Sequence, residues 1–187
     1  LLLQLRKDEF MREHELKSIV RSGRLTPNQV GTLNCLEQTL HHDELHGYQA
    51  LIIGGSGDYS VFDKLKFKDT LALILAATKD TGFPVLGSCW GAQFMADIFG
   101  GKVETDPEKE EVGSYEVAPT KHAPKDPLFF DAPAKLWAQI GHHESITKLP
   151  NGAVNLVSSK RCEFQAFTWP DSNQYALQLH SDLNKDE

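Results

Sequence analysis

The sequence predicts an α/β fold in which a mostly parallel central sheet carries helices on both faces and gains antiparallel strands in its second half. Three observations predict this architecture. Short apolar runs alternate with helical patterns through the first half of the chain, as they do in parallel sheets. Two of these runs end at glycine-rich turns. From residue 102 on, the chain consists mostly of strand-like runs.

The first expected elements are a strand, a helix and two further strands. Residues 1–5 form an apolar run suited to a buried strand, and residues 8–22 place apolar side chains among charges at helical spacing. Residues 32–36 and 48–53 are the next expected strands. The carboxyl ends of such parallel strands form the edge of the sheet where ligands bind.

A second helix is expected over residues 67–79, because the apolar positions there recur at spacings of three and four residues. Residues 85–87 form a fourth strand and residues 92–99 a third helix, which ends at Gly100-Gly101. The strands expected in the second half span residues 112–117, 135–140, 153–158, 162–169 and 175–180.

The length of 187 residues fits one domain, and no linker or repeat divides the chain. We therefore expect a single domain over residues 1–187. The chain opens directly on an apolar run and stops shortly after the last expected strand, so both ends are expected to be trimmed.

Composition and charge narrow the class of protein. Hydrophobic residues make up 40% and charged residues 24%, and the net charge of -7 argues weakly against nucleic acid or an anionic membrane as partner. The cysteines at positions 35, 89 and 162 are odd in number and have no paired spacing, which favours a reducing, cytoplasmic location and no metal site. No apolar run is long enough to span a bilayer, and no signal peptide or ATP-binding motif is found.

The most informative segment is Gly87-Ser88-Cys89-Trp90-Gly91-Ala92-Gln93. A strand enters a tight turn there and leaves it as a helix, with Cys89 at the apex and a glycine two residues away on each side. A nucleophile elbow requires glycine at these positions because neighbouring backbone lies too close for a Cβ atom. The helix N-terminus also favours the thiolate. Cys89 is therefore predicted to be a nucleophile, whereas Cys35 and Cys162 are read as core residues.

A thiol nucleophile requires a base, and His180 is the candidate among eight histidines. It closes an expected strand at the same edge of the sheet as the elbow, and Asp182 follows within reach of its imidazole. The order Cys, His, Asp differs from that of α/β-hydrolases, in which the acid precedes the histidine.

Gly54-Gly55 begins a glycine-rich turn after the strand at residues 48–53. Acyl chemistry requires two N–H donors for the oxyanion, which Gly55 and Trp90 would supply. A plain tight turn is the alternative. A phosphate cradle is disfavoured because no Lys-Ser/Thr pair follows the glycines.

Together these segments resemble the class I glutamine amidotransferases, which carry a GxCxGxQ motif, an upstream GG turn and a late His-x-Glu. The stand-alone members similar to the glutaminase domain of GMP synthase match best. The resemblance implies a flavodoxin-like fold and hydrolysis of the glutamine side-chain amide through a γ-glutamyl thioester on Cys89, without a cofactor. It also implies substrate contacts from Gly54, Gln93, Gly141 and His142.

Two residues depart from the family pattern. Asp182 stands where the family has glutamate, and His143 replaces a glycine of the loop that begins at Gly141. Two alternatives therefore stay open: a peptidase that cleaves γ-glutamyl bonds of small peptides or conjugates, and a catalytically silent relative that binds a ligand or partner. The resemblance implies a small-molecule substrate, and it implies that the ammonia acceptor is a separate synthetase subunit.

Overall fold

Five parallel strands build one half of the molecule. The computed structural model describes residues 1–183. In its nine-stranded sheet, the strand order is β2-β1-β3-β4-β11-β10-β9-β6-β7, and the first five strands pair in parallel. This half contains β1 (Leu2–Gln4), β2 (Thr32–Asn34), β3 (Leu51–Ile53), β4 (Val85–Ser88) and β11 (Gln174–Leu177). The predicted parallel sheet is confirmed.

Antiparallel strands continue the sheet beyond β11, as the second half of the sequence predicted. They are β6 (Glu111–Pro119), β7 (Leu136–His142), β9 (Val154–Ser159) and β10 (Ala166–Thr168). A separate two-stranded sheet pairs β5 (Lys102–Thr105) with β8 (Glu144–Lys148). These last two strands were not predicted, because each is short and carries charged residues.

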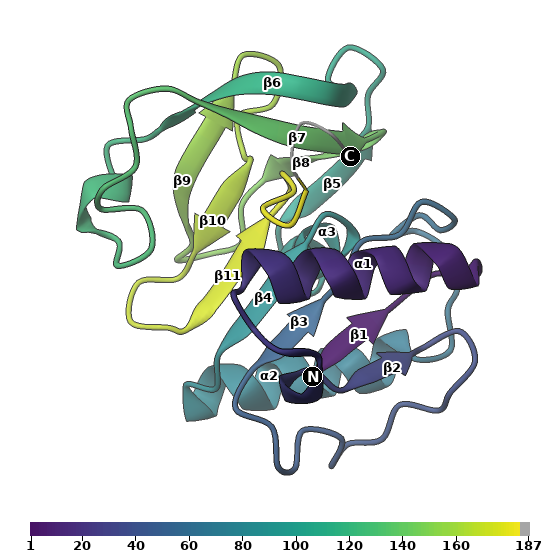
Figure 1. Ribbon diagram of the computed structural model, residues 1–187. Helices are drawn as coiled ribbons and strands as arrows, with labels where there is room; N and C mark the ends of the chain where they lie inside the picture. Colours follow the sequence, from purple (N-terminus) through teal and green to yellow (C-terminus); the bar gives the residue numbers. More distant parts are fainter. Residues whose placement is uncertain (184–187) are drawn as a thin grey trace.

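Helices cover both faces of the parallel half. In Figure 1, α1 (Glu9–Ser22) crosses in front of the strands, whereas α2 (Lys68–Thr81) and α3 (Trp90–Ile98) lie behind them. The short 3₁₀ turns are η1 (Pro27–Gln29) and η2 (Ala123–Lys125). Asp8 caps α1 by accepting a hydrogen bond from the N–H of Met11, and Gly82 ends α2 in a left-handed conformation. Within residues 1–183, no helix is long and apolar enough to cross a membrane.

Two apolar clusters hold the layers together. The larger one joins α2 and α3 to the parallel strands, with Leu75, Trp90 and Phe94 among its fully buried side chains. The smaller one lies under the antiparallel strands and includes Leu156 and Val157. Strand β4 pairs in parallel with β3 on one side and β11 on the other, so the carboxyl ends of these three strands lie at one edge of the sheet.

Candidate active site

The elbow between β4 and α3 holds Cys89 in a backbone conformation that is rare for residues other than glycine. Its φ is 49° and its ψ is -103°, and it directly precedes the first residue of α3. Such a conformation costs of order 1–3 kcal/mol and persists where the surrounding structure enforces it. The helix therefore begins at Trp90, two residues earlier than predicted, with its N-terminus at the sulfur.

The two flanking glycines are required by close packing, as predicted. A Cβ atom at Gly87 would lie 2.7 Å from the carbonyl carbon of Gly91. A Cβ atom at Gly91 would lie 2.5 Å from the carbonyl oxygen of Ile53 and 2.9 Å from its Cβ. The elbow thus packs directly against β3.

We expect Gly91→Ala to destabilise the fold by about 1–3 kcal/mol, because the added methyl group meets backbone and a β-branched side chain that have little freedom to move. Thermal or denaturant unfolding measures this loss. Gly141→Ala is the matched control, since a Cβ atom at Gly141 meets nothing within 4 Å. Equal stabilities of the two variants would contradict the packing described for the elbow.

The Cys89 sulfur lies beside the end of β7. Only 6% of Cys89 is exposed, and its Sγ donates to the carbonyl oxygen of Gly141 at 3.6 Å. This contact brings the predicted Gly141 segment to the nucleophile from the antiparallel half of the molecule. The site therefore lies where the two halves of the sheet meet.

His180 follows β11, which ends at Leu177 and so is shorter than the predicted strand over residues 175–180. The His180 N–H donates to the carbonyl oxygen of Gln139 at 2.8 Å, an isolated bridge to β7 that fixes this part of the backbone. Its Nδ1 lies 3.2 Å from Oδ1 of Asp182. The carbonyl oxygen of Asp182 accepts hydrogen bonds from Ser22 Oγ at 3.0 Å and Arg21 Nη2 at 2.9 Å, so helix α1 anchors the loop.

Neighbouring charges and hydrogen bonds shift the pKa values of His180 and Asp182. Burial alone lowers the pKa of His180, but hydrogen bonds to Asp182 and Cys89 and the charges of both partners raise it to about 10. Burial alone would raise the pKa of Asp182, but the hydrogen bond and charge of His180 outweigh it and hold that pKa below its ordinary value. The arrangement therefore favours a protonated His180 imidazole, held between Asp182 and Cys89.

The Gly54–Gly55 turn lies beside Cys89 and His180. A Cβ atom at Gly55 would lie 3.4 Å from Cys89 Cβ, 3.6 Å from His180 Cε1 and 3.2 Å from Arg6 Nη2. Nucleophile, imidazole and a guanidinium thus surround the open side of Gly55. Trp90 is the first residue of α3, so no carbonyl within the helix accepts its N–H.

Sequence reasoning missed Arg6 and Glu15, both of which border this turn. Arg6 lies two residues after the end of β1, at the carboxyl edge where ligands bind, and that position was the available signal. Glu15 lies on the buried face of α1 and accepts the Gly55 N–H at 3.2 Å. A charged residue on the inward side of an amphipathic helix was the signal for Glu15.

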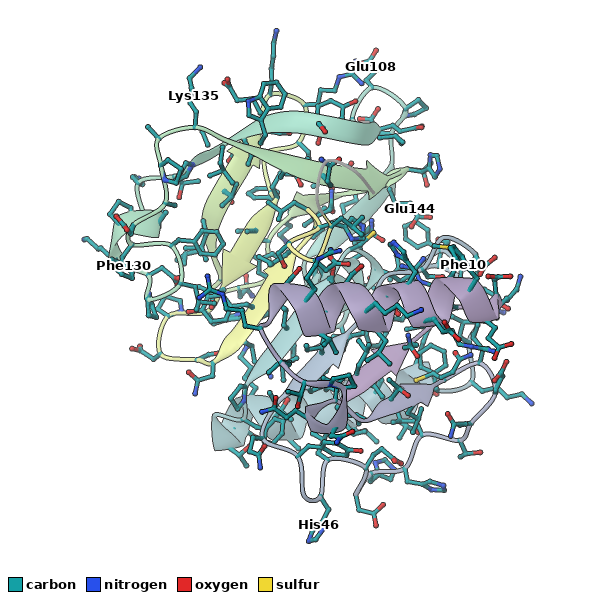
Figure 2. The ribbon with its side chains drawn as sticks, in the orientation of Figure 1. Phe10, His46, Glu108, Phe130, Lys135 and Glu144 are labelled. Carbon is teal, nitrogen blue, oxygen red and sulfur yellow. The ribbon has the colours of Figure 1, made fainter. Side chains whose placement is uncertain are left out.

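The predicted substrate-contact residues differ in how they are placed. Gly141 is exposed at the end of β7 and touches the nucleophile. Gln93 is buried, and its Nε2 donates to the carbonyl oxygen of Glu144 at 2.7 Å, which ties α3 to the start of β8. Figure 2 shows Glu144 in the upper, antiparallel part of the molecule, above the helix that begins near Phe10. The amide of Gln93 thus positions the loop beside Cys89.

His142 is enclosed in a polar cluster inside the antiparallel half. Its Nε2 lies 3.5 Å from Oε2 of Glu111 and 2.9 Å from Nε2 of Gln178. The same Gln178 amide donates to Cys162 Sγ at 3.4 Å, and its Oε1 accepts the Ile146 N–H, which fixes its orientation. Glu111, His142 and Cys162 bring possible metal-ligating atoms within 4.8 Å of one another, but the nitrogen and the sulfur face this amide N–H₂ group. We therefore read the cluster as a hydrogen-bonded support for the Gly141 loop.

The fold and the elbow cysteine match the class of protein that the sequence predicts, and the comparison with known proteins agrees. The chain belongs to the glutamine amidotransferase class-I family, which matches residues 14–185. It is 35% identical over 106 residues to the glutamine-hydrolyzing GMP synthase of Lactobacillus acidophilus, covering 57% of this chain and 20% of that protein. It is 34% identical over 100 residues to one subunit of the glutamine-hydrolyzing GMP synthase of Methanopyrus kandleri, covering 54% of this chain and 52% of that protein.

Solved structures share the fold. A glutamine amidotransferase from Thermotoga maritima superposes with a TM-score of 0.78 at 22% identity, covering 97% of this chain and 76% of that one. A glutamine amidotransferase from Methylobacillus flagellatus gives 0.77 at 21% identity, with coverages of 98% and 70%. The predicted family and the flavodoxin-like fold with added antiparallel strands are thereby confirmed.

Proposed function

We propose that the chain hydrolyses the side-chain amide of glutamine, with Cys89, His180 and Asp182 as its catalytic residues. The observation that carries the proposal is the meeting of three elements at one point: the elbow cysteine at the start of helix α3, the buried His180–Asp182 pair and the open side of Gly55. Class I glutamine amidotransferase membership supports the reaction class.

The charge state of His180 suits the first half of the reaction. The Cys89 thiolate attacks the amide carbon, and the oxyanion forms beside the N–H groups of Gly55 and Trp90. The imidazolium then gives its proton to the leaving nitrogen, so the C–N bond breaks, ammonia departs and a γ-glutamyl thioester remains. Gly141 leaves room for the glutamyl chain, and Gly54 lets the turn that carries Gly55 pack against Glu15. Gln93 and His142 position the loop that borders the chain.

The second half of the reaction follows from the same pKa argument. Two of the causes that raise the pKa of His180 are its hydrogen bond to Cys89 and the charge of that residue. The imidazole is already neutral because it has given its proton to the leaving ammonia, and acylation of the sulfur removes both of these causes of a raised pKa. The imidazole takes a proton from water, whose oxygen attacks the thioester carbon and releases glutamate and the thiolate.

The destination of the ammonia is a separate synthetase subunit in our proposal. The Methanopyrus kandleri relative is named as a subunit of a glutamine-hydrolysing GMP synthase. The chain spans only a fifth to a half of the curated relatives described above. The three cysteines of the chain are free thiols, which supports a reducing compartment such as the cytoplasm.

Incubation of the protein with L-glutamine tests the proposal. We expect ammonia and glutamate in equal amounts, and acid quenching during turnover should trap a glutamyl adduct on the peptide that contains Cys89. The same assay with γ-glutamyl dipeptides separates the two enzymatic readings: turnover of the dipeptides alone would identify a γ-glutamyl peptidase. If neither substrate gives product or adduct while the protein is folded, the silent, ligand-binding alternative replaces the proposal.

A further inference from the structure

Glu15 is a buried carboxylate that neither the family resemblance nor the proposed reaction uses. It lies on the inward face of α1, is 5% exposed and contacts the Gly54–Gly55 turn. Its Oε1 accepts the Gly55 N–H at 3.2 Å and the Nη2 and Nε atoms of Arg6 at 3.2 and 3.3 Å. Its Oε2 accepts Nε2 of Gln4 at 3.1 Å. Burial raises the pKa of the Glu15 carboxyl above its ordinary value, and the charge and hydrogen bonds of Arg6 and Gln4 oppose that shift.

The shape of the turn is fitted to this carboxylate. A Cβ atom at Gly54 would lie 2.5 Å from Oε1 of Glu15 and 2.9 Å from its carboxyl carbon. Glycine at this position is thus explained by the approach of Glu15. The other face of the turn, at Gly55, opens toward Cys89 and His180. The turn therefore separates the buried carboxylate from the reacting atoms by a single peptide unit.

The Gly55 N–H can donate a strong hydrogen bond to only one acceptor at a time, either Glu15 or the oxyanion. In the proposed reaction it stabilises the oxyanion, which requires a well-aligned donor. In the structure it donates to the carboxyl group that pairs with Arg6, and charge-assisted hydrogen bonds to such a group are roughly twice as strong as neutral ones. Donation to Glu15 and donation to the oxyanion are thus in competition.

We propose that Glu15 restrains the oxyanion turn, so that the Gly55 N–H must leave Glu15 before it stabilises the tetrahedral intermediate. This inference rests on the proposed function. Arg6 and Gln4 keep their hydrogen bonds to the Glu15 carboxylate when the Gly55 N–H breaks its own. The buried carboxylate therefore stays paired throughout. Glu15 is a positioning residue in this account: it acts through Gly55 and does not touch the substrate.

The test replaces Glu15 by glutamine, which has the same shape but only a neutral acceptor for Gly55. We expect faster hydrogen exchange of the Gly55 amide, followed by NMR, and a kcat for the γ-glutamyl substrate raised by about three- to tenfold, the difference between a charged and a neutral acceptor. KM and the rate at which iodoacetamide alkylates Cys89 should stay close to the wild-type values, because neither depends on the oxyanion donor.

Two further variants sharpen the test. Glu13→Gln lies two residues earlier on the same helix, where the exposed Glu13 pairs with Lys17, and it should leave every readout unchanged. Glu15→Asp keeps the charge but shortens the side chain by one methylene, so it should also free Gly55 and raise kcat. It replaces the glutamine variant if that protein fails to fold.

The outcomes separate this inference from the proposed function. If the wild type turns over and the Glu15 variants are no faster, or if Gly55 exchange is unchanged, the restraint is wrong while the reaction stands. If the Glu15 variants hydrolyse the γ-glutamyl substrate and the wild type does not, both proposals are supported. Glu15 then holds the Gly55 N–H in nearly all molecules of the free chain. If neither the wild type nor the variants hydrolyse a γ-glutamyl compound although iodoacetamide modifies Cys89, the proposed function fails and the restraint fails with it.

Discussion

Replacement of Cys89 by alanine is expected to lower the rate of glutamine hydrolysis by about four orders of magnitude or more, as the loss of a nucleophile does in other triad hydrolases. No other thiol of the chain can take its place. Burial raises the pKa of Cys35 to about 12, and it also raises the pKa of Cys162. Both side chains are buried and remain protonated at neutral pH, so neither offers a thiolate.

The fold should survive this substitution. Alanine has the same Cβ constraint as cysteine at the positive φ of the elbow, and the lost contact of Sγ with Gly141 is a long, weak hydrogen bond. Release of ammonia and glutamate measures activity, and thermal unfolding verifies the fold. Cys35→Ser is the control: it changes a thiol remote from the elbow and should retain hydrolysis. A folded Cys89→Ala protein that keeps most of the wild-type rate would show that the elbow cysteine is not the nucleophile.

The parallel half of the fold and the position of the elbow could be predicted from the sequence because each depends on local patterns. The strand at residues 1–5, the helix at 67–79 and the turn around Cys89 all carry apolar periodicity or glycine spacing that few other structures produce. Parallel strands then bring their carboxyl ends to one edge, which is why the turn at Gly54-Gly55 was expected beside Cys89.

The rest could not be predicted, because it depends on contacts between segments far apart in the chain. Strands β5 and β8 are short and form a sheet only by pairing with each other. Sequence alone also gave no direction for the side chains of Gln93 and His142, which turn inward to hold the Gly141 loop. The same holds for Glu15, whose contact with Gly55 joins residues 40 positions apart.

The Asp182→Asn variant is expected to reduce kcat by about two to four orders of magnitude, the range seen when a triad carboxylate loses its charge. The carboxylate accepts from His180 at 3.2 Å and contributes both a hydrogen bond and a charge to the raised pKa of that imidazole. Asparagine removes the charge, so the imidazole is less readily protonated. The main-chain contacts of residue 182 with Ser22 and Arg21 do not involve its side chain, and the loop should therefore keep its place.

The pKa shifts of His180 and Asp182 determine how the stability of the fold changes with pH. The pKa of His180 in the folded protein, about 10, lies above its ordinary value of 6.5, so the ion pair stabilises the fold fully below pH 6.5. That stability is lost as the pH rises through about 10. Asp182 behaves in the opposite sense: its pKa is lowered, so its contribution is present above its ordinary value of 3.8 and is lost as the pH falls. In Asp182→Asn, both the activity and the extra stability should disappear at a lower alkaline pH than in the wild type.

An Asp182→Glu variant separates charge from geometry in this prediction. Glutamate keeps the negative charge and restores the His-x-Glu pattern of the family resemblance, so it should retain the alkaline limit of the wild type even if kcat changes. Titration of the His180 ring by NMR in all three proteins reports the pKa directly, and Asp131→Asn, an exposed site, serves as the neutral control. An unchanged His180 pKa in Asp182→Asn would mean that Asp182 does not contribute to the raised pKa of the imidazole, and that the carboxylate serves only to orient the ring.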